Sequence, residues 1–502
     1  MNTKGFKRFL SDNKVWLLFV FSMAFFVFTM VHNLMHSALW GDEWAEYHIS
    51  QKAIRNGELY ANIIATFQPP LYNYFMHFWL RINQSLLWFR LFNVVIGCVS
   101  GASLYLAVKK LTDHRWAAAS LVCLATCYRW VYCTQECSEY ALMLCFLFLT
   151  VWAYVEFVSE FKIRWLILLI LAAVCSIYSQ YGSVFVAVPC LVGALIKYVF
   201  FDNKNKKHAI TVIVSYVISL GAFAVPLYIF FLKKQLANNE ISENSTVLTP
   251  ELLKDFPFTL GRILGYFYNL NGTDVWMFIG GALTIVLFVL SVIILAKKKV
   301  SFVQGSLVVI LWGAYTLHYI LVQLHIYAMV HPGQSAGFFG RYSYFYIPLA
   351  LATAAVILYK TTTLGIHART VVKLICGACL LSMFLSFYAL KDNWYKAKDN
   401  IYADIWVENR GYESTTFLFG VAEDGFDYYV SHLEGFDPSW LDSKTYDLDL
   451  EDLPDDFWAW RTNWGGNGWG ETIAKARELG YDVTVYDDAG YDGQLAHCVK
   501  VS

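Results

Sequence analysis

The chain has 502 residues, of which 57% are hydrophobic and only 15% are charged, and this composition excludes an ordinary soluble protein. The formal net charge of −1 conceals an uneven distribution: residues 1–390 hold 29 Lys/Arg and 16 Asp/Glu, a balance of +13, whereas residues 391–502 hold 9 Lys/Arg and 23 Asp/Glu, a balance of −14. The acidic C-terminal segment argues against nucleic-acid partners, so we predict a membrane domain over 1–390 and a small soluble domain over 391–502.

Eleven apolar segments approach the length of about 20 residues that a bilayer-spanning helix needs. The first lacks the small-residue cleavage site of a signal peptide, so we expect it to be retained. With the N-terminus in the cytoplasm, 19 Lys/Arg of the membrane domain fall at cytoplasmic positions and 10 at outer positions, which is the positive-inside bias. An odd number of spans then places the C-terminal domain on the extracytoplasmic side. The predicted spans are residues 15–35, 86–108, 116–134, 140–158, 164–181, 183–201, 209–232, 276–296, 302–322, 342–360 and 369–390.

An acidic stretch directly follows the first span, in the outer segment 36–85. Asp42 and Glu43 are adjacent, so on a helix they point about 100° apart and are poorly placed to face one bond together. One carboxylate can act as a base while the other orients it or binds an acceptor. The alternative, which composition alone leaves open, is a pair of solvated acids that cap a helix.

The same outer segment continues with aromatic residues and the sequence Gln68-Pro69-Pro70-Leu71-Tyr72. The apolar piece from Pro69 to Ile82 is too short to cross a bilayer and is expected to be an interfacial or re-entrant helix with proline at its first turn. Tyr47 and Tyr72 belong to a group of aromatics that is typical of an interfacial belt. Such residues can also stack on a sugar or line the path of a prenyl chain.

Three arginines fall at the outer ends of predicted spans, namely Arg90, Arg129 and Arg341. An arginine at this level can extend to the membrane interface, or its guanidinium can bind a phosphate through two parallel hydrogen bonds. Glu136 lies at the same outer level in a segment that is otherwise readable as a short polar hairpin, and Tyr342 follows Arg341.

The acidic C-terminal segment is expected to form a small α/β domain with its own core. Four of its tryptophans, at 458, 460, 464 and 469, favour core packing or membrane docking over sugar stacking. The only cysteine of the segment, Cys498, cannot form a disulfide within it. The expected elements are helices over Asn393–Arg410, Asp424–Leu433 and Glu471–Leu479, and strands over Thr415–Phe419, Trp458–Thr462, Asp482–Tyr486 and Leu495–Val501.

The order of these motifs resembles the GT-C class of membrane glycosyltransferases that use polyprenyl-phosphate sugars, which includes protein O-mannosyltransferases, lipid A aminoarabinose transferases and sugar transferases acting on lipopolysaccharide core. The resemblance spans roughly residues 15–360 and departs from the family pattern at three positions: Gln68 stands for a basic residue, Asn73 for a second tyrosine and Ser138 for an arginine. It is carried by Asp42-Glu43, by Gln68-Pro69-Pro70-Leu71-Tyr72, by Arg90-Leu91 opening a span, by Gln135-Glu136 with Tyr140, and by Gly340-Arg341-Tyr342.

The resemblance implies transfer of a sugar from a polyprenyl-phosphate donor to a glycan, lipid or protein acceptor at the outer face of the cytoplasmic (inner) membrane. Asp42 would act as base or align the acceptor hydroxyl, with Glu43 in support. Arg341, with Arg90 as a candidate second group, would stabilise the departing lipid phosphate. No cofactor is expected to be required, since no metal-ligand spacing occurs and a divalent metal, although possible, has no motif in its support. The residues implied in substrate binding are Tyr47, Gln68, Tyr72, Arg90, Glu136, Arg341 and Tyr342.

The sequence therefore predicts an α-helical polytopic membrane protein, GT-C-like with about 11 transmembrane helices, and a small C-terminal α/β soluble domain. Two other functional classes stay open at this stage. A transporter or flippase of polyprenyl-linked sugars predicts acids in mid-span and two similar halves. A membrane-anchored binding or assembly protein predicts that the C-terminal domain alone binds a partner and that Asp42 is replaceable. The donor sugar, the acceptor, the oligomeric state and the role of the C-terminal domain are not specified by any motif.

Overall fold

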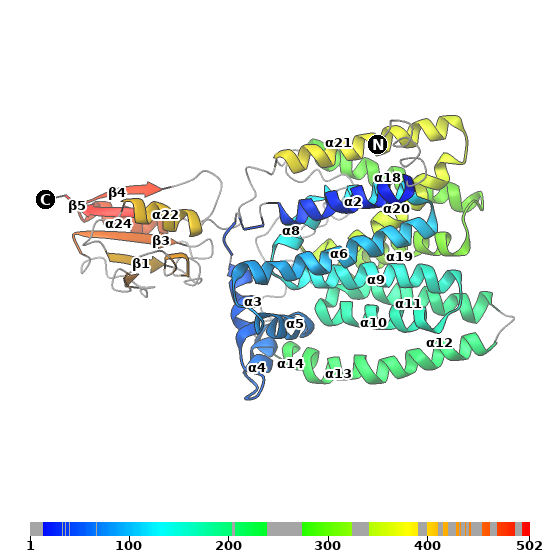
Figure 1. The fold of residues 1–502 in the computed structure, drawn as a ribbon, viewed down its shortest axis with the longest axis horizontal. Helices are drawn as coiled ribbons and strands as arrows, with labels where there is room; N and C mark the ends of the chain where they lie inside the picture. Colours follow the sequence, from blue (N-terminus) through cyan, green and yellow to red (C-terminus); the bar gives the residue numbers. More distant parts are fainter. Residues whose placement is uncertain are drawn as a thin grey trace, which may run out of the picture. The chain divides into compact units, whose positions relative to one another are not determined.

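The computed structural model describes residues 14–32, 34–35, 37–39, 41–66, 68–202, 206–237, 274–323, 341–389, 399–409, 415–419, 428–430, 432, 437, 441–442, 454–461, 469–486 and 494–501. The chain forms two compact units. The first unit comprises Met1–His32 with Ile49–Ala389, and the second comprises Asn33–His48 with Leu390–Ser502. Figure 1 shows that the first unit is helical and that the second is built on a sheet.

The helices of the first unit run side by side as a bundle, with short helices at one end (Figure 1). One further helix, α3 (Gly41–Gln51), begins in the second unit and ends in the first. The helices of the first unit are α2 (Lys14–Val31), α4 (Glu58–Ala65), α5 (Leu71–Leu80), α6 (Leu86–Leu111), α7 (His114–Ala125), α8 (Tyr128–Gln135), α9 (Glu139–Ser159), α10 (Ile163–Ser179), η1 (Tyr181–Ser183), α11 (Val184–Ile196), η2 (Lys197–Phe201), α12 (Lys206–Ser219), η3 (Leu220–Ala224), α13 (Val225–Leu227), η4 (Tyr228–Leu232), α14 (Lys233–Leu236), α18 (Asp274–Ala296), α19 (Phe302–Gln323), η7 (Arg341–Tyr346), α20 (Ile347–Thr362) and α21 (Ile366–Ala389).

The predicted multi-span membrane protein is confirmed. Within the described ranges, seven helices are long and apolar enough to cross a membrane, and three shorter helices are also apolar. The remaining predicted span, 116–134, is not one helix but two, because α7 ends at Ala125 and α8 begins at Tyr128. At the break the Thr126 hydroxyl donates to the Val122 carbonyl at 3.0 Å, and Cys127 adopts an extended backbone.

Two glycines on α6 allow α2 to approach it closely. A Cβ atom at Gly97 would lie 2.5 Å from the Met30 sulfur, and one at Gly101 would lie 2.6 Å from the Phe26 ring. The two glycines are four residues apart and therefore share a face of the helix, as in the small-residue pairs through which membrane helices pack. Met30 and Phe26 of α2 thus occupy the space beside Gly97 and Gly101, where any larger residue on α6 would collide with them.

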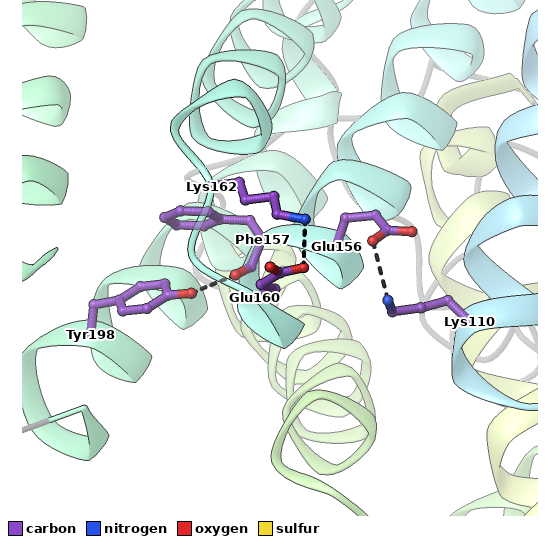
Figure 2. A network of polar contacts seen from close by, with 6 residues as sticks. All are labelled: Lys110, Glu156, Phe157, Glu160, Lys162 and Tyr198. Atoms are coloured by element: carbon purple, nitrogen blue, oxygen red, sulfur yellow. Dashed lines mark hydrogen bonds and ion pairs between the residues drawn. The ribbon is translucent and has the colours of Figure 1, made fainter.

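Polar contacts join the ends of neighbouring helices near the last turns of α6 and α9, as Figure 2 shows. Lys110, in the last turn of α6, pairs with Glu156 of α9 at 3.5 Å, and the Tyr198 hydroxyl of η2 donates to the Phe157 carbonyl at 2.5 Å. In the connection to α10, Lys162 donates to Glu160 at 2.8 Å and lowers the pKa of that exposed carboxyl. The Lys162–Glu160 pair is largely in water and stabilises the fold little, whereas the Tyr198–Phe157 hydrogen bond is buried.

The second unit contains a five-stranded mixed sheet in the order β2-β1-β3-β5-β4. Strands β2 and β3 run parallel to β1, whereas β5 runs antiparallel to both β3 and β4. The predicted small C-terminal α/β fold is thereby confirmed; β2 was not predicted, since two residues carry no readable pattern. Of the predicted elements, residues 393–398, 410, 462 and most of 424–433 lie outside the described ranges. The elements are α22 (Asp399–Asn409), β1 (Thr415–Phe419), β2 (Leu441–Asp442), β3 (Asp456–Arg461), α24 (Trp469–Glu478), β4 (Tyr481–Tyr486) and β5 (Gln494–Lys500).

Both faces of this sheet carry a core, because successive residues of β3 point to opposite sides. Phe457 and Ala459 pack in the cluster that includes Ile473 of α24, whereas Trp458 and Trp460 pack in the cluster that includes α22. Both tryptophans are fully buried, which confirms core packing for these two. Trp464 lies outside the described ranges, as does the side chain of Trp469.

Cys498 of β5 is buried in the cluster beneath α24. Burial raises the pKa of its thiol from an ordinary value near 9 to about 12, with Arg477 lowering and Asp456 raising it to a smaller extent. Because the thiolate is the reactive form, we expect Cys498 to resist maleimide at pH 8 until the second unit unfolds. Because the thiol ionises more easily in the unfolded chain, the free energy of unfolding should fall as the pH rises above about 9.

The measurement is mass spectrometry of the peptide containing Cys498 after labelling the full chain in detergent, with and without guanidinium. Equal labelling rates under the two conditions would contradict the buried thiol.

Candidate functional site

The acidic stretch forms the first two turns of α3. Asp42 and Glu43 lie in the first turn, where carboxylates interact favourably with the positive end of the helix dipole. Glu43 is 1% exposed and Asp42 is half-buried, so the two adjacent acids differ in environment. Glu46, which was not among the predicted site residues, is 2% exposed. Its spacing of three residues from Glu43 was the signal that could have identified it.

Tyr47 lies in an aromatic cluster within the second unit. Its ring packs edge-on against Trp44 with centroids 5.8 Å apart, and Trp44 packs against Tyr428 at 5.2 Å. Burial raises the pKa of the Tyr428 hydroxyl, and the neighbouring Tyr47 raises it further. Tyr47 is therefore a buried member of a cluster in this structure, and its predicted contact with a substrate stays a prediction.

The motif that contains two prolines opens α5, the predicted short helix that cannot cross a bilayer. Pro70 stands at the N-cap of α5, and Tyr72 is fully buried with its ring edge-on to Phe92 of α6 at 6.2 Å. The Gln68 carbonyl, one turn earlier, accepts a hydrogen bond from the Gln235 side chain at 2.7 Å. Tyr72 and Gln68 thus lie where the short helices α4 and α5 meet α6 and α14.

Gln235 of α14 was missed by the sequence reading, although it is fully buried and binds three partners. Its amide donates to the carbonyls of Ile63 at 3.0 Å and Gln68, and its Oε1 accepts from the Tyr181 hydroxyl at 2.7 Å. A glutamine that follows two lysines at the end of an apolar segment carries no local signal of such a role.

We expect Gln235→Leu to lower the free energy of unfolding by about 1–3 kcal/mol, because buried carbonyls and a hydroxyl lose their partner. The measurement is the thermal unfolding midpoint in detergent. Gln51→Leu is the control, since Gln51 is exposed and its loss should change stability by less than about 0.5 kcal/mol. Equal midpoints for both variants would contradict the role of Gln235.

Buried charged residues gather where α6, α8, α9 and η7 meet. Arg90 of α6 is 3% exposed, and Glu136, which follows α8, is 1% exposed. Asn93, one turn after Arg90, donates from its side chain to the Glu136 carbonyl. The structure therefore brings the predicted residues Arg90 and Glu136 to adjoining parts of one buried layer. Charged groups in a membrane bundle are costly and are usually kept for a function.

The same layer contains Arg129 of α8, which is buried. Its guanidinium lies 5.6 Å from the ring centroid of Tyr344 in η7, and that ring also packs edge-on against Tyr140 of α9 at 5.8 Å. Arg341 and Tyr342 open η7, three and two residues before Tyr344, and their side chains lie outside the described parts of the chain. Their predicted roles stay predictions. Asn93 and Tyr344 also belong to this buried layer, and no sequence motif indicated either of them.

Among the residues that the structure describes, no group of three or more His, Cys, Asp or Glu side chains could hold a metal ion. The expectation that no cofactor is required stays untested.

Comparison with known proteins gives a family for part of the chain. Residues 67–229 match the family described as dolichyl-phosphate-mannose-protein mannosyltransferase. The match includes Gln68, Tyr72, Arg90 and Glu136 and lies between Asp42 and Arg341. A comparison of the sequence with curated proteins found no match.

The solved structures show the fold. ArnT from Cupriavidus metallidurans bound to undecaprenyl phosphate is similar with a TM-score of 0.54 and 13% identity, over 97% of this chain and 98% of that chain. Its apo state gives 0.54 and 12% over the same shares. An Archaeoglobus fulgidus oligosaccharyltransferase tethered to an acceptor peptide gives 0.50 and 11%, over 84% of this chain and 64% of that chain. The predicted GT-C fold and the predicted enzyme class, a membrane glycosyltransferase, are confirmed by the family match and the fold together.

Proposed function

We propose that this GT-C glycosyltransferase transfers a sugar from a polyprenyl-phosphate donor to an acceptor at the outer face of the cytoplasmic membrane. The observation that carries the proposal is the likeness, over 97% of the chain, to ArnT bound to undecaprenyl phosphate. The family matched by residues 67–229 is itself named for a sugar carried on dolichyl phosphate. A sugar on a long-chain isoprenoid phosphate is the donor chemistry that the two names share.

In the proposed reaction, an acceptor hydroxyl attacks the anomeric carbon as the bond from that carbon to the phosphate oxygen breaks. Asp42 takes the proton of the acceptor hydroxyl, or aligns it, and Glu43 supports this role. The lipid phosphate leaves with additional negative charge, which Arg341 stabilises with Arg90 as a second group. The burial of Arg90 supports this assignment, since a guanidinium held away from water interacts more strongly with a phosphate.

We propose the remaining substrate contacts at Tyr47, Gln68, Tyr72, Glu136 and Tyr342. The membrane orientation belongs to the same proposal. With the N-terminus in the cytoplasm, the layer of Arg90, Arg129 and Glu136 faces the outer leaflet, and the Lys110–Glu156 end of the bundle faces the cytoplasm. The asymmetry of Lys/Arg along the membrane domain supports this orientation. Accessibility of single cysteines introduced at exposed positions 55 and 115 to an impermeant reagent would test it in intact cells.

The test of function is a transfer assay in membranes, with a panel of labelled polyprenyl-phosphate sugars and envelope extracts as acceptors. At least one donor is expected to lose its sugar to an acceptor, with release of the lipid phosphate. Movement of the lipid-linked sugars between leaflets without any transfer would overturn the proposal.

A further inference from the structure

A face of α3 is buried along its full length. Glu43, Glu46, Tyr47 and Ser50 are all buried, and their spacing of three, four and seven residues places them on one side of a helix. At about 100° per residue, Ser50 points within about 20° of Glu43 and about 40° of Glu46. Whatever fixes the direction of Ser50 therefore also fixes the direction of these two carboxylates.

Ser50 is bound through both its side chain and its backbone, and both partners come from α5. Its hydroxyl donates to Asn73 Oδ1 at 3.1 Å, and its carbonyl lies 2.9 Å from His77 Nδ1. A carbonyl can only accept, so Nδ1 carries the hydrogen of this ring. Asn73 and His77 are four residues apart on one face of α5, and all three residues are at most 4% exposed.

These two hydrogen bonds differ from ordinary helix contacts. Ser50 lies in the last turn of α3, where carbonyls have no partner inside the helix, so His77 satisfies a group that would otherwise be unpaired. Because one bond holds the side chain and the other holds the backbone, α3 cannot rotate about its axis without breaking at least one of them. Both are shielded from water, where the loss of a partner is costly.

We propose that Asn73 and His77 are positioning residues that fix the rotation of α3, and with it the side of the helix that presents Glu43 and Glu46. The catalytic consequence rests on the proposed function, because it is the acidic face of α3 that is being oriented. Asn73 stands where the resembled family has a second tyrosine, and the structure gives this departure a specific partner, Ser50.

The first test compares His77→Leu with His77→Asn in the transfer assay. Leucine removes the donor to the Ser50 carbonyl, whereas the asparagine amide nitrogen occupies the position of the ring Nδ1 and can restore the bond. We expect His77→Leu to lower kcat by about 10–100-fold, with the KM for the donor changed by less than about twofold, because a small misplacement acts on the reacting geometry. His77→Asn is expected to recover most of the rate.

Ser50→Ala serves as a milder second variant, since it removes only the hydroxyl. The controls are His114→Leu and Ser103→Ala, which remove a histidine bonded to Tyr105 at 3.0 Å and a hydroxyl bonded to the Val99 carbonyl at 2.7 Å. In the Asp42→Asn background, His77→Leu should cause little additional loss, because the two changes act through the same helix.

The second test measures hydrogen exchange of the amides of residues 41–51 in the full chain, and it does not depend on activity. Exchange should be faster in His77→Leu and Ser50→Ala than in either control. Wild-type exchange together with wild-type kcat in both variants would overturn the positioning role. If exchange rises as expected while the unmodified protein transfers no sugar from any donor, the positioning role stands and the proposed function fails.

Discussion

Replacing Asp42 by asparagine is expected to lower the rate of sugar transfer by about 10²–10⁴-fold, the range that a positioned general base contributes. The amide keeps the shape of the side chain but cannot take a proton from the acceptor hydroxyl. Asp42 is half-buried at the start of α3, so its replacement should leave the fold and the expression level unchanged. The rate is measured with the donor that the wild-type protein uses best.

Asp113→Asn is the matched control for this change. Asp113 caps α7 by accepting from the backbone nitrogens of Arg115 at 2.8 Å and Trp116 at 3.2 Å, and an amide oxygen can accept both bonds. Its activity should equal that of the wild type. Glu43→Gln identifies which acid accepts the proton. If its transfer rate falls further than that of Asp42→Asn, Glu43, the more buried acid, is the base. Full activity of Asp42→Asn would rule out the base role.

Replacing Arg341 by alanine is expected to reduce kcat by about 10²–10³-fold, as for other groups that stabilise charge developing in a transition state. The phosphate gains charge only as its bond to the sugar breaks, so the KM for the donor should change much less than kcat. Arg341→Lys should recover part of the rate, because lysine supplies the charge without the two parallel donors of a guanidinium.

Arg115→Ala is the control for loss of a cation, since Arg115 is exposed in the first turn of α7. It should transfer at the wild-type rate. A loss in Arg341→Ala that appears only in KM would show that the arginine binds the donor without assisting bond cleavage. Unchanged kinetics would remove Arg341 from the proposed site.

The membrane helices could be predicted because their signal is local: a run of apolar residues as long as the bilayer is thick. The strands of the second unit were equally readable, since Phe457 and Ala459 alternate with Trp458 and Trp460 in the pattern of a sheet with two covered faces. The break in the span 116–134 was not readable. It is marked by the extended backbone of Cys127, and the hydroxyl bond of Thr126 is no signal because the same bond occurs in the unbroken helices α6 and α9.

The residues of the candidate site also fall into two groups, those that a local sequence pattern indicates and those that it does not. Arg90 and Glu136 could be found because a charged residue beside an apolar span is conspicuous in a sequence. Gln235 could not, because its partners at Ile63 and Gln68 are about 170 residues away in the chain. Ser50, Asn73 and His77 are ordinary residues of amphipathic helices until α3 and α5 pack together. Such roles arise from tertiary contacts, which no local pattern reports.

The glycine pair of α6 also bears on how the protein is made. Helix α2 leaves the ribosome first, but the hollow that accepts Met30 and Phe26 does not exist until Gly97 and Gly101 have been synthesised. At about 5–20 residues per second, the first helix must stay in the bilayer without this partner for roughly 3–13 seconds. During that interval lipid tails take the place of α6, and they must be displaced when the two helices assemble. Translation stalled inside this window would leave α2 inserted yet unassembled, and therefore open to quality-control proteases.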